Sequence, residues 1–162
     1  MATDTADLKR LWAPWRHAFL AKPFKGRCIF CAARSTRDAR KQLVVMRSPR
    51  ALVMLNLYPY NNGHVMIAPR RHVGDLEHLT PAEWAEMGRL SQRMMQRLRR
   101  LLRPHGFNLG LNQGRVAGAG FPGHLHLHIV PRWNGDTNFM PTLGGAKVIS
   151  QSLDELYRLL RR

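Results

Sequence analysis

The sequence has no apolar run that approaches the roughly 20 residues needed to cross a membrane. Its first residues, MATDTADLKRLWAPW, contain no apolar core ahead of a small-residue cleavage site. Cysteine is also scarce, since Cys28 and Cys31 are the only two. This number excludes a disulfide scaffold and is typical of a metal or redox pair. We therefore expect a cytoplasmic protein with no membrane partner.

Acidic residues are few as well. The chain has 10 Asp or Glu against 26 Lys or Arg, which gives a formal net charge of +16. A surface of this sign attracts partners that carry phosphate groups. Because the arginines are spread along the chain, ordinary solvated charge and nucleic-acid binding explain the excess about equally well. Nucleic acid is thus a secondary candidate partner.

Composition and length indicate one folded domain. The 162 residues are 44% hydrophobic and 22% charged, as in packed globular proteins, and leave room for a single core. Residues 1–25 mix tryptophans with basic residues and prolines, and we expect them to form an N-terminal arm packed on the domain. Residues 26–162 are expected to form that single domain, with the C-terminal tail included.

Short apolar runs and capping signals predict an α+β fold with one long and one short helix. Thr80 and Glu83 have the spacing of a helix capping box, and the helix should extend to Pro104. A short helix is expected around residues 153–160. Five strands are predicted over residues 42–47, 51–57, 64–69, 107–112 and 125–131, mainly antiparallel because most links between them are short. The core-facing stripe of the long helix comprises Trp84, Met87, Leu90, Met94, Leu98, Leu101 and Leu102.

Three histidines, His124, His126 and His128, alternate with aliphatic residues in the last predicted strand. Alternate residues of a strand share a face, so the three imidazoles should line one side while the aliphatic residues pack on the other. Three purely structural histidines at this spacing are improbable, because each buried imidazole needs its own hydrogen-bond partner. The three histidines are therefore candidate functional residues.

Two kinds of chemistry suit this row of histidines. It could hold a metal that activates water, or one imidazole could attack a substrate phosphorus as a nucleophile. The glycine-rich segment 114–123, directly upstream, offers main-chain N–H groups and an arginine to a phosphate. A hydrolytic metal site usually includes a carboxylate, and the nearest one, Asp136, lies beyond the end of the predicted strand. The sequence therefore favours nucleophilic attack on phosphorus.

The motif HLHLHIV resembles that of the histidine triad (HIT) superfamily of nucleotide-binding proteins. The similarity extends over most of the chain, through LWAPWR, CIFC, NLYPYNNGHVMIAP, GFNLGLN and HIVPRWNGDTNFMP. It is strongest with the bacterial branch of diadenosine tetraphosphate phosphorylases and ATP adenylyltransferases. The resemblance implies a HIT-like fold and an enzyme that acts at the α-phosphate of a nucleotide or dinucleoside polyphosphate. It also implies a homodimer in which two protomers share one extended sheet.

The resemblance assigns roles to individual residues. The middle histidine of the triad, His126, matches the family nucleophile and would form a nucleotidyl-histidine intermediate, with His124 and His128 orienting it. His64 matches a histidine that lies beside the triad, near the phosphates. Asn56 matches a residue that hydrogen-bonds the ribose; without the resemblance it would be interpreted as a turn former at a strand end.

Further nucleotide-binding candidates lie around the glycine-rich segment. Asn112 precedes this segment and matches a polar residue on the phosphate or leaving-group side; without the resemblance it would be interpreted as a loop cap. Gly118 and Gly120, within the segment, would contact the nucleotide. Trp133 could pack on a nucleobase or simply cap the strand.

The sequence leaves the acceptor of the nucleotidyl group open. Phe121 and Pro122 stand where relatives often have small, hydroxyl-bearing or acidic residues. With phosphate as the acceptor, diadenosine tetraphosphate would yield ADP and ATP. With water it would yield AMP and ATP, and a nucleoside phosphoramidate is the alternative substrate of such a hydrolase.

By the same resemblance, Cys28 and Cys31 form a structural zinc site together with His72 and His124. A closed tetrahedral site of this kind would tie the CIFC segment to the strand that carries the histidines. A lone C-x-x-C motif is also compatible with a reduced pair that binds no metal. No organic cofactor is expected.

Overall fold

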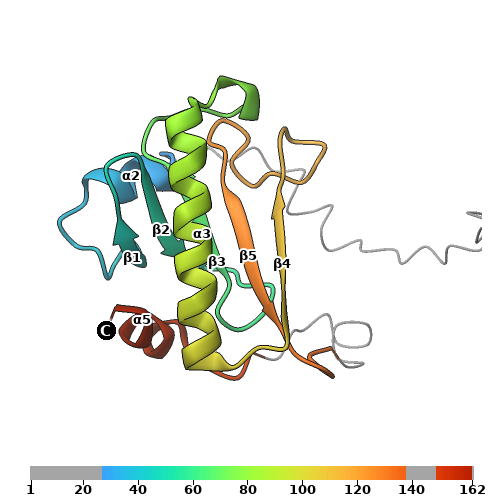
Figure 1. Ribbon diagram of the computed structural model, residues 1–162. Helices are drawn as coiled ribbons and strands as arrows, with labels where there is room; N and C mark the ends of the chain where they lie inside the picture. The colour runs from blue at the N-terminus through green and yellow to red at the C-terminus, as the bar shows by residue number, and fades with distance from the viewer. Residues whose placement is uncertain (1–26, 138–148, 162) are drawn as a thin grey trace, which may run out of the picture.

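Five strands form one antiparallel sheet in the order β1-β2-β3-β5-β4 (Figure 1). The computed structural model describes residues 27–137 and 149–161, so the predicted arm over residues 1–25 lies outside the described residues. The mainly antiparallel, five-stranded sheet predicted from the sequence is confirmed. The strands are β1 (Val44–Arg47), β2 (Ala51–Leu55), β3 (Val65–Pro69), β4 (Gly106–Leu111) and β5 (Leu127–Arg132).

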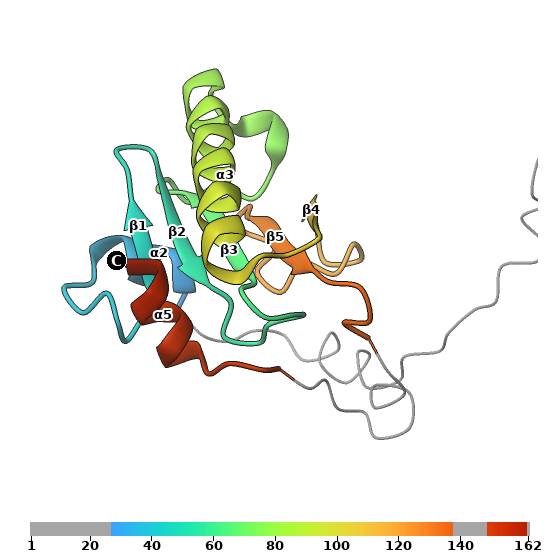
Figure 2. The same cartoon turned by 60° about the horizontal axis from the view of Figure 1, so that its bottom comes forward.

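Helices cover both faces of the sheet. The long helix α3 (Pro81–Leu102) and the C-terminal helix α5 (Leu153–Arg161) lie on one face, and the short helix α2 (Ile29–Ser35) packs against the other (Figures 1 and 2). A short 3-10 helix, η2 (Leu76–His78), precedes α3. The long and short helices predicted from the sequence correspond to α3 and α5. None of the helices among the described residues is long and apolar enough to span a bilayer.

Strand β2 contributes side chains to two hydrophobic cores, one on each face of the sheet. All five of its residues are buried. Val53 and Leu55 belong to the cluster that includes α3 and α5, whereas Leu52 and Met54 belong to the cluster that includes Phe30 of α2. Because side chains alternate along a strand, a strand covered on both faces is apolar throughout. The sheet is therefore the middle layer of three.

Helix α3 begins with the predicted capping box. The Thr80 hydroxyl accepts the main-chain N–H of Glu83, and the Glu83 carboxylate accepts the main-chain N–H of Thr80. The helix ends at Leu102, two residues before Pro104. Trp84 and Leu101, which were predicted to face the core, are instead 46% and 39% exposed. They lie in the first and last turns of the helix.

Helix α2 was not predicted. It has only seven residues, which is too short for a helical repeat of apolar positions to be recognised in the sequence. Its buried residues, Phe30 and Ala33, pack against β1, β2 and β3 on the face opposite α3. Helix α2 therefore completes the second core and brings the CIFC segment to the sheet.

Candidate functional site

The three histidines of the HLHLHIV motif are buried at the start of β5. His124, His126 and His128 are at most 9% exposed. The rings of His124 and His126 lie 4.9 and 4.8 Å from the ring of Phe30 in α2, and the His126 and His128 rings are 4.8 Å apart. Leu127, between His126 and His128, and Ile129, after His128, pack into the opposite core, against α3 and α5. The structure thus places the imidazoles on the α2 face of the sheet, although regular strand pairing begins only at Leu127.

The tautomer of His126 is fixed by a main-chain group. Its Nδ1 lies 2.8 Å from the carbonyl oxygen of His124. Because a carbonyl can only accept, Nδ1 must carry the proton and Nε2 must hold the lone pair. Burial lowers the pKa of His126, which favours the neutral imidazole. A neutral imidazole with its Nε2 lone pair uncommitted within the described residues is a competent nucleophile.

A chain of hydrogen bonds fixes the tautomers of the neighbouring histidines. The main-chain N–H of Tyr60 donates to His64 Nδ1 over 3.0 Å, and the Asn56 amide lies 3.3 Å from the same nitrogen. His64 therefore carries its proton on Nε2, which lies 2.9 Å from His128 Nδ1 and donates to it. His128 then carries its own proton on Nε2. This chain leaves His128 with an N–H that can be donated to a bound group.

His64 and His128 are both neutral near physiological pH. Burial, followed by the nearby His128 and His126, lowers the pKa of His64 to about 3. Burial and the neighbouring His126 lower the pKa of His128 to about 4. An imidazolium in this place would be poorly solvated and would repel the others. The site therefore presents neutral donors and acceptors.

The two asparagines predicted to bind the nucleotide both form hydrogen bonds within the protein. Asn56, just after β2, uses its side-chain oxygen to accept the N–H of Tyr58 at 3.0 Å while its amide approaches His64. Asn112, just after β4, donates to the carbonyl of Gly118 over 3.5 Å. Asn56 thus lies beside the histidines and holds one of them, whereas Asn112 ties the glycine-rich segment to β4.

The glycine-rich segment contains turns that use part of its main chain. Gly114 and Gly118 have positive φ angles of 79° and 89°, which glycine adopts without strain. The N–H of Gly118 donates to the Arg115 carbonyl over 3.0 Å. A Cβ on Gly120 would meet no neighbour within 4 Å, so this position is open. The two predicted glycines therefore differ, since the Gly118 amide is engaged in a turn.

Trp133 is not brought to the histidines. It follows the last residue of β5, so the length of the strand, about 20 Å, separates it from His126. Its indole N–H donates to the carbonyl of Leu102 over 3.3 Å, at the C-terminal end of α3. The sequence left open whether Trp133 packs on a nucleobase or caps the strand. The contact with the end of α3 is a structural one at the end of β5.

A second cluster lies at the other end of the triad. The side-chain ligand atoms of Cys28, Cys31, His72 and His124 all lie within 4.8 Å of one another. Cys28 Sγ and His72 Nδ1 each lie 3.2 Å from His124 Nδ1, and Cys31 Sγ lies 3.3 Å from His72 Nδ1 and 3.7 Å from His124 Nδ1. Tetrahedral coordination at typical Zn–S and Zn–N bond lengths puts nitrogens about 3.3 Å apart and sulfur and nitrogen about 3.6 Å apart. The four residues could therefore hold a metal ion.

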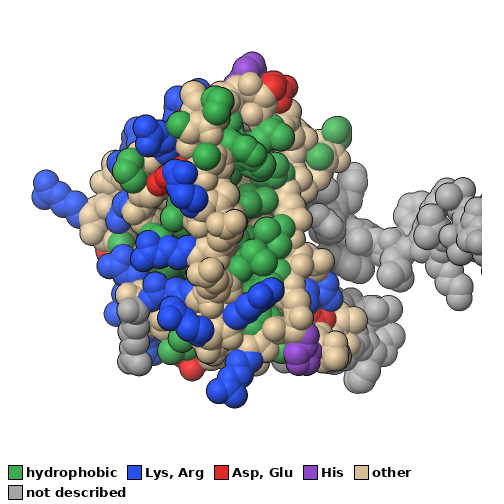
Figure 3. All heavy atoms as spheres, viewed as in Figure 1, with side chains coloured by type: hydrophobic (Ala, Val, Ile, Leu, Met, Phe, Trp, Pro, Cys, Tyr) green, Lys and Arg blue, Asp and Glu red, His purple; other side chains and the backbone are tan. Residues whose placement is uncertain are grey.

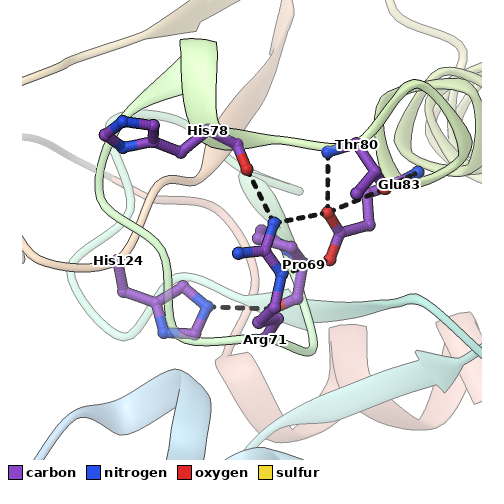
Figure 4. Close-up of polar contacts among 6 residues, drawn as sticks. All are labelled: Pro69, Arg71, His78, Thr80, Glu83 and His124. Carbon is purple, nitrogen blue, oxygen red and sulfur yellow. Dashed lines mark hydrogen bonds and ion pairs between the residues drawn. The ribbon is translucent and has the colours of Figure 1, made fainter.

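The surrounding contacts prepare His124 to be a ligand. Its Nε2 donates to the carbonyl oxygen of Pro69, the last residue of β3, over 2.9 Å (Figure 4). Because Nε2 carries the proton, the lone pair of His124 is on Nδ1, the nitrogen that faces the other ligand atoms. Metal-binding histidines are commonly oriented in this way, by donating the ring N–H that does not face the metal to a carbonyl oxygen. The donor set and its orientation both fit a metal.

The segment after β3 that carries His72 is anchored on two sides. Arg71 reaches Glu83 with two hydrogen bonds of 3.0 and 2.8 Å and donates to the carbonyl of His78 over 2.7 Å (Figure 4). The hydrogen bonds from Arg71 lower the pKa of Glu83 to about 2. On the other side, a Cβ at Gly74 would lie 2.8 Å from the Pro122 carbonyl, so this close approach requires glycine. These contacts hold His72 against His124.

Sequence analysis missed several residues that shape the site. Phe30 packs on two of the histidines, Pro69 orients His124, and Tyr60 orients His64 through its main chain. The Tyr60 ring also stacks 5.8 Å from that of His128 and remains half exposed. Two of these contacts use main-chain groups, which leave no residue-type signal in a sequence. The NLYPYNNGH segment gave the one available signal, because its turn residues bring Tyr60 back towards His64.

Three comparisons with known proteins each find similar proteins. The model of the HIT domain family matches residues 37–135. A Mycobacterium tuberculosis protein named AP-4-A phosphorylase is 43% identical over 95% of this chain and 83% of its own length. The bis(5'-nucleosyl)-tetraphosphatase (asymmetrical) of Schizosaccharomyces pombe is 32% identical over 57% of this chain and 50% of its own. A zinc-bound histidine triad family protein from Mycobacterium smegmatis superposes with a TM-score of 0.65 at 30% identity, covering 83% of this chain and 90% of that one.

Proposed function

The chain belongs to the HIT domain family, and from this premise we propose that it is a nucleotidyl transferase that splits dinucleoside polyphosphates. The nucleophile is Nε2 of His126. Diadenosine tetraphosphate and phosphate are converted to ADP and ATP through a covalent adenylyl-His126 intermediate. The hydrogen bond from His126 Nδ1 to the His124 carbonyl carries this proposal, because it leaves the lone pair on the other ring nitrogen.

The reaction consists of two displacements at the same phosphorus. The His126 lone pair forms a P–N bond with the α-phosphate, and the P–O bond to the remaining polyphosphate breaks to release ATP. A phosphate oxygen then attacks this phosphorus, the P–N bond breaks and ADP leaves. His126 regains its lone pair, so the protein is unchanged after one cycle.

The His64–His128 pair assists by donating a hydrogen bond. With its Nδ1 occupied by His64, His128 keeps its proton on Nε2 and can donate it to an oxygen of the bound phosphate. Such a donor stabilises the charge that develops on the oxygens during attack. The 4.8 Å separation of the His126 and His128 rings supports action of both on one phosphate group.

The nucleotide would lie on the α2 face around these histidines. Asn56 lies next to His64, which supports a ribose contact. Asn112 and the open position Gly120 support phosphate contacts from the glycine-rich segment, whereas Gly118 would contribute through the shape of its turn. Trp133 has no part in this nucleotide site.

The names of the relatives support the substrate class. The Mycobacterium tuberculosis relative is called a phosphorylase, and it matches nearly the whole chain. The Schizosaccharomyces pombe relative is called a tetraphosphatase, which favours water as a second candidate acceptor. The greater identity and coverage of the former lead us to propose phosphate.

Zinc is the metal that we propose for the Cys28, Cys31, His72 and His124 cluster. Two thiolates and two imidazoles are a preferred donor set for zinc, and a site closed by four protein ligands is structural. When bound, the ion would supply a cross-link between α2, the segment after β3 and the start of the triad. Neither cysteine forms a disulfide, and we propose a reducing, cytoplasmic setting for such a site.

We also propose that the protein is a homodimer joined through β4. This strand pairs only with β5 among the described strands, so one of its edges is available for pairing. Leu109 of β4 is 47% exposed, and Trp84 is exposed on the neighbouring helix α3. Two copies that pair along β4 would cover these side chains. Light scattering of the wild type and a Leu109→Lys variant tests this assembly, and an unchanged dimer in the variant would contradict it.

Product analysis tests the proposed reaction. The protein is mixed with diadenosine tetraphosphate, with and without phosphate, and the products are separated by chromatography. We expect ADP and ATP to form only when phosphate is present. AMP and ATP without phosphate would show a hydrolase instead. His126→Ala should remove turnover, whereas His78→Ala, a matched substitution of an exposed histidine, should preserve it.

A further inference from the structure

Helix α3 has two exposed flanks of opposite character. Arg89, Arg93, Arg97 and Arg100 follow one another at steps of four, four and three residues, so they share one flank. Lys and Arg side chains gather on this side of α3, whereas apolar side chains occupy the side towards β4 (Figure 3). Arg99 marks the second flank, since its guanidinium lies 5.4 Å from the ring of Phe107 in β4.

Among the described residues, acidic side chains leave most of the basic flank unneutralised. Glu86 pairs with Arg89 at its N-terminal end. Arg93, Arg97 and Arg100 form no ion pair within residues 27–137 and 149–161. Burial, followed by Arg100, Arg93 and the α5 residue Arg161, lowers the pKa of Arg97. These positive charges thus repel one another on a helix that the protein nevertheless keeps folded.

The same surface continues into an open depression at the N-terminal end of α3. The depression is lined by Arg34, Arg50 and Arg70, together with the Arg71–Glu83 pair. Glu86 lies between the two regions. Its pKa is lowered by hydrogen bonds from Arg89 and from Ser48 in the β1–β2 turn, and then by the charge of Arg50. We define the arginine surface as Arg34, Arg50, Arg70, Arg93, Arg97 and Arg100.

The composition and shape of this surface fit a chain of phosphates. Every cation in it is an arginine, whose planar guanidinium can donate two hydrogen bonds to one phosphate. Arginines four residues apart on a helix are about 6 Å apart along its axis, so the cations form a row. A single small anion would occupy only one part of such a row. A polymer with regularly spaced negative charges would contact the whole of it.

We propose that the arginine surface binds the phosphate backbone of nucleic acid, independently of base sequence. A membrane surface suits it less well, because a helix that binds a bilayer inserts its apolar side. The core residues of α3 are instead buried against the sheet, and its exposed apolar side chains lie on the flank opposite the arginines (Figure 3). Neutralising the row with phosphates would also remove the repulsion among its arginines. This activity is separate from turnover of dinucleotides, because Arg93, Arg97 and Arg100 of α3 lie across the sheet from His126 on the α2 face.

Binding of a fluorescent duplex DNA of mixed sequence, measured by anisotropy between about 50 and 200 mM salt, tests the proposal. The logarithm of the binding constant should fall linearly with that of the salt concentration. The double variant Arg93→Gln, Arg97→Gln should bind more weakly, and its slope should be smaller by about 2. The matched control Arg99→Gln, Arg158→Gln removes two charges elsewhere and should keep the wild-type slope. Both variants should retain dinucleotide turnover.

Three results would overturn the proposal. The wild type could fail to bind DNA at the lowest salt concentration. The two double variants could lose the same affinity, which would show a response to net charge alone. The protein could bind vesicles that contain phosphatidylserine and leave DNA free, which would identify a membrane surface. Dinucleotide turnover is assayed separately, so failure here does not bear on the role of His126.

Discussion

The main-chain carbonyl of His124 accepts a hydrogen bond from His126 Nδ1 over 2.8 Å, while the His124 side chain turns to the two cysteines. One residue therefore serves two sites. Its carbonyl prepares the nucleophile, and its imidazole belongs to the group that could hold a metal. The Pro69 carbonyl keeps that imidazole in place from the other side. A metal bound there would restrain the main chain that sets the tautomer of His126.

His72→Ala should therefore remove the metal and destabilise the protein. We expect zinc content to fall from one per chain to near zero and the free energy of unfolding to decrease by more than about 3 kcal/mol. Elemental analysis and denaturant unfolding measure the two effects. His78→Ala, another exposed histidine six residues away, is the control and should keep both. Full zinc content in His72→Ala would contradict the assigned ligand set.

His64→Leu should slow turnover without removing it. The substitution breaks the hydrogen bond that holds the proton of His128 on Nε2, so His128 becomes a poorer donor to phosphate. We expect kcat to fall by roughly ten- to a hundredfold, at the lower end of what a positioned proton donor contributes, with little change in KM. Steady-state kinetics measure both constants. A normal kcat would show that the His64–His128 contact is only structural.

The dependence of kcat/KM on pH follows from the lowered pKa values. His128 must be neutral for its Nδ1 to accept the hydrogen bond from His64. Burial lowers the pKa of His128 to about 4 from the usual 6.5. His64, with a pKa lowered to about 3, is neutral over the same range. Activity should thus persist as pH falls below 6.5 and decline only near pH 4. A decline of kcat/KM centred at pH 6.5, with zinc content unchanged, would contradict the prediction that His64 and His128 are neutral at that pH.

Glu83→Gln should weaken the start of α3. The carboxylate accepts hydrogen bonds from Arg71 and from the main chain of Thr80, and its pKa is lowered to about 2 from 4.5. It therefore stabilises the fold above pH 4.5, and this contribution is lost as pH falls towards 2. Near neutral pH we expect a loss of about 1–2 kcal/mol, measured by denaturant unfolding, and a smaller difference in acid.

Glu86→Gln is the matched control for this substitution. Glu86 lies one turn further along α3 and pairs with the exposed Arg89. Ion pairs of this kind contribute little to stability, so the change should be under about 0.5 kcal/mol. Equal losses in the two variants would show that the contact between Glu83 and Arg71 has no special role.

The parts of the fold that depend on local patterns could be predicted from the sequence. The capping box of Thr80 and Glu83 located the start of α3, and the alternation around His126 predicted that the imidazoles share one side of the strand. The resemblance to the HIT superfamily is confirmed by the family match. The sheet order could not be read from the strands alone, because β5 lies between β3 and β4.

The details that depend on main-chain contacts could not be predicted. The carbonyl of Pro69 and the N–H of Tyr60 orient two histidines, yet any residue type supplies these groups. Trp84 fits the apolar stripe of α3 yet is 46% exposed, and the spacing of residues along a helix does not show which elements pack against each turn. Trp133 similarly suits a nucleobase by residue type, and only the fold shows that it lies at the far end of β5.

The most direct test of the central claim is to trap the intermediate on His126. Wild-type protein is mixed with diadenosine tetraphosphate in the absence of phosphate, quenched in alkaline denaturant because P–N bonds are labile in acid, and analysed by peptide mass spectrometry. We predict one added adenylyl group on the peptide that contains His126, and its loss when phosphate is supplied before the quench. An adenylyl group on another peptide, or undiminished turnover in His126→Ala, would contradict the account.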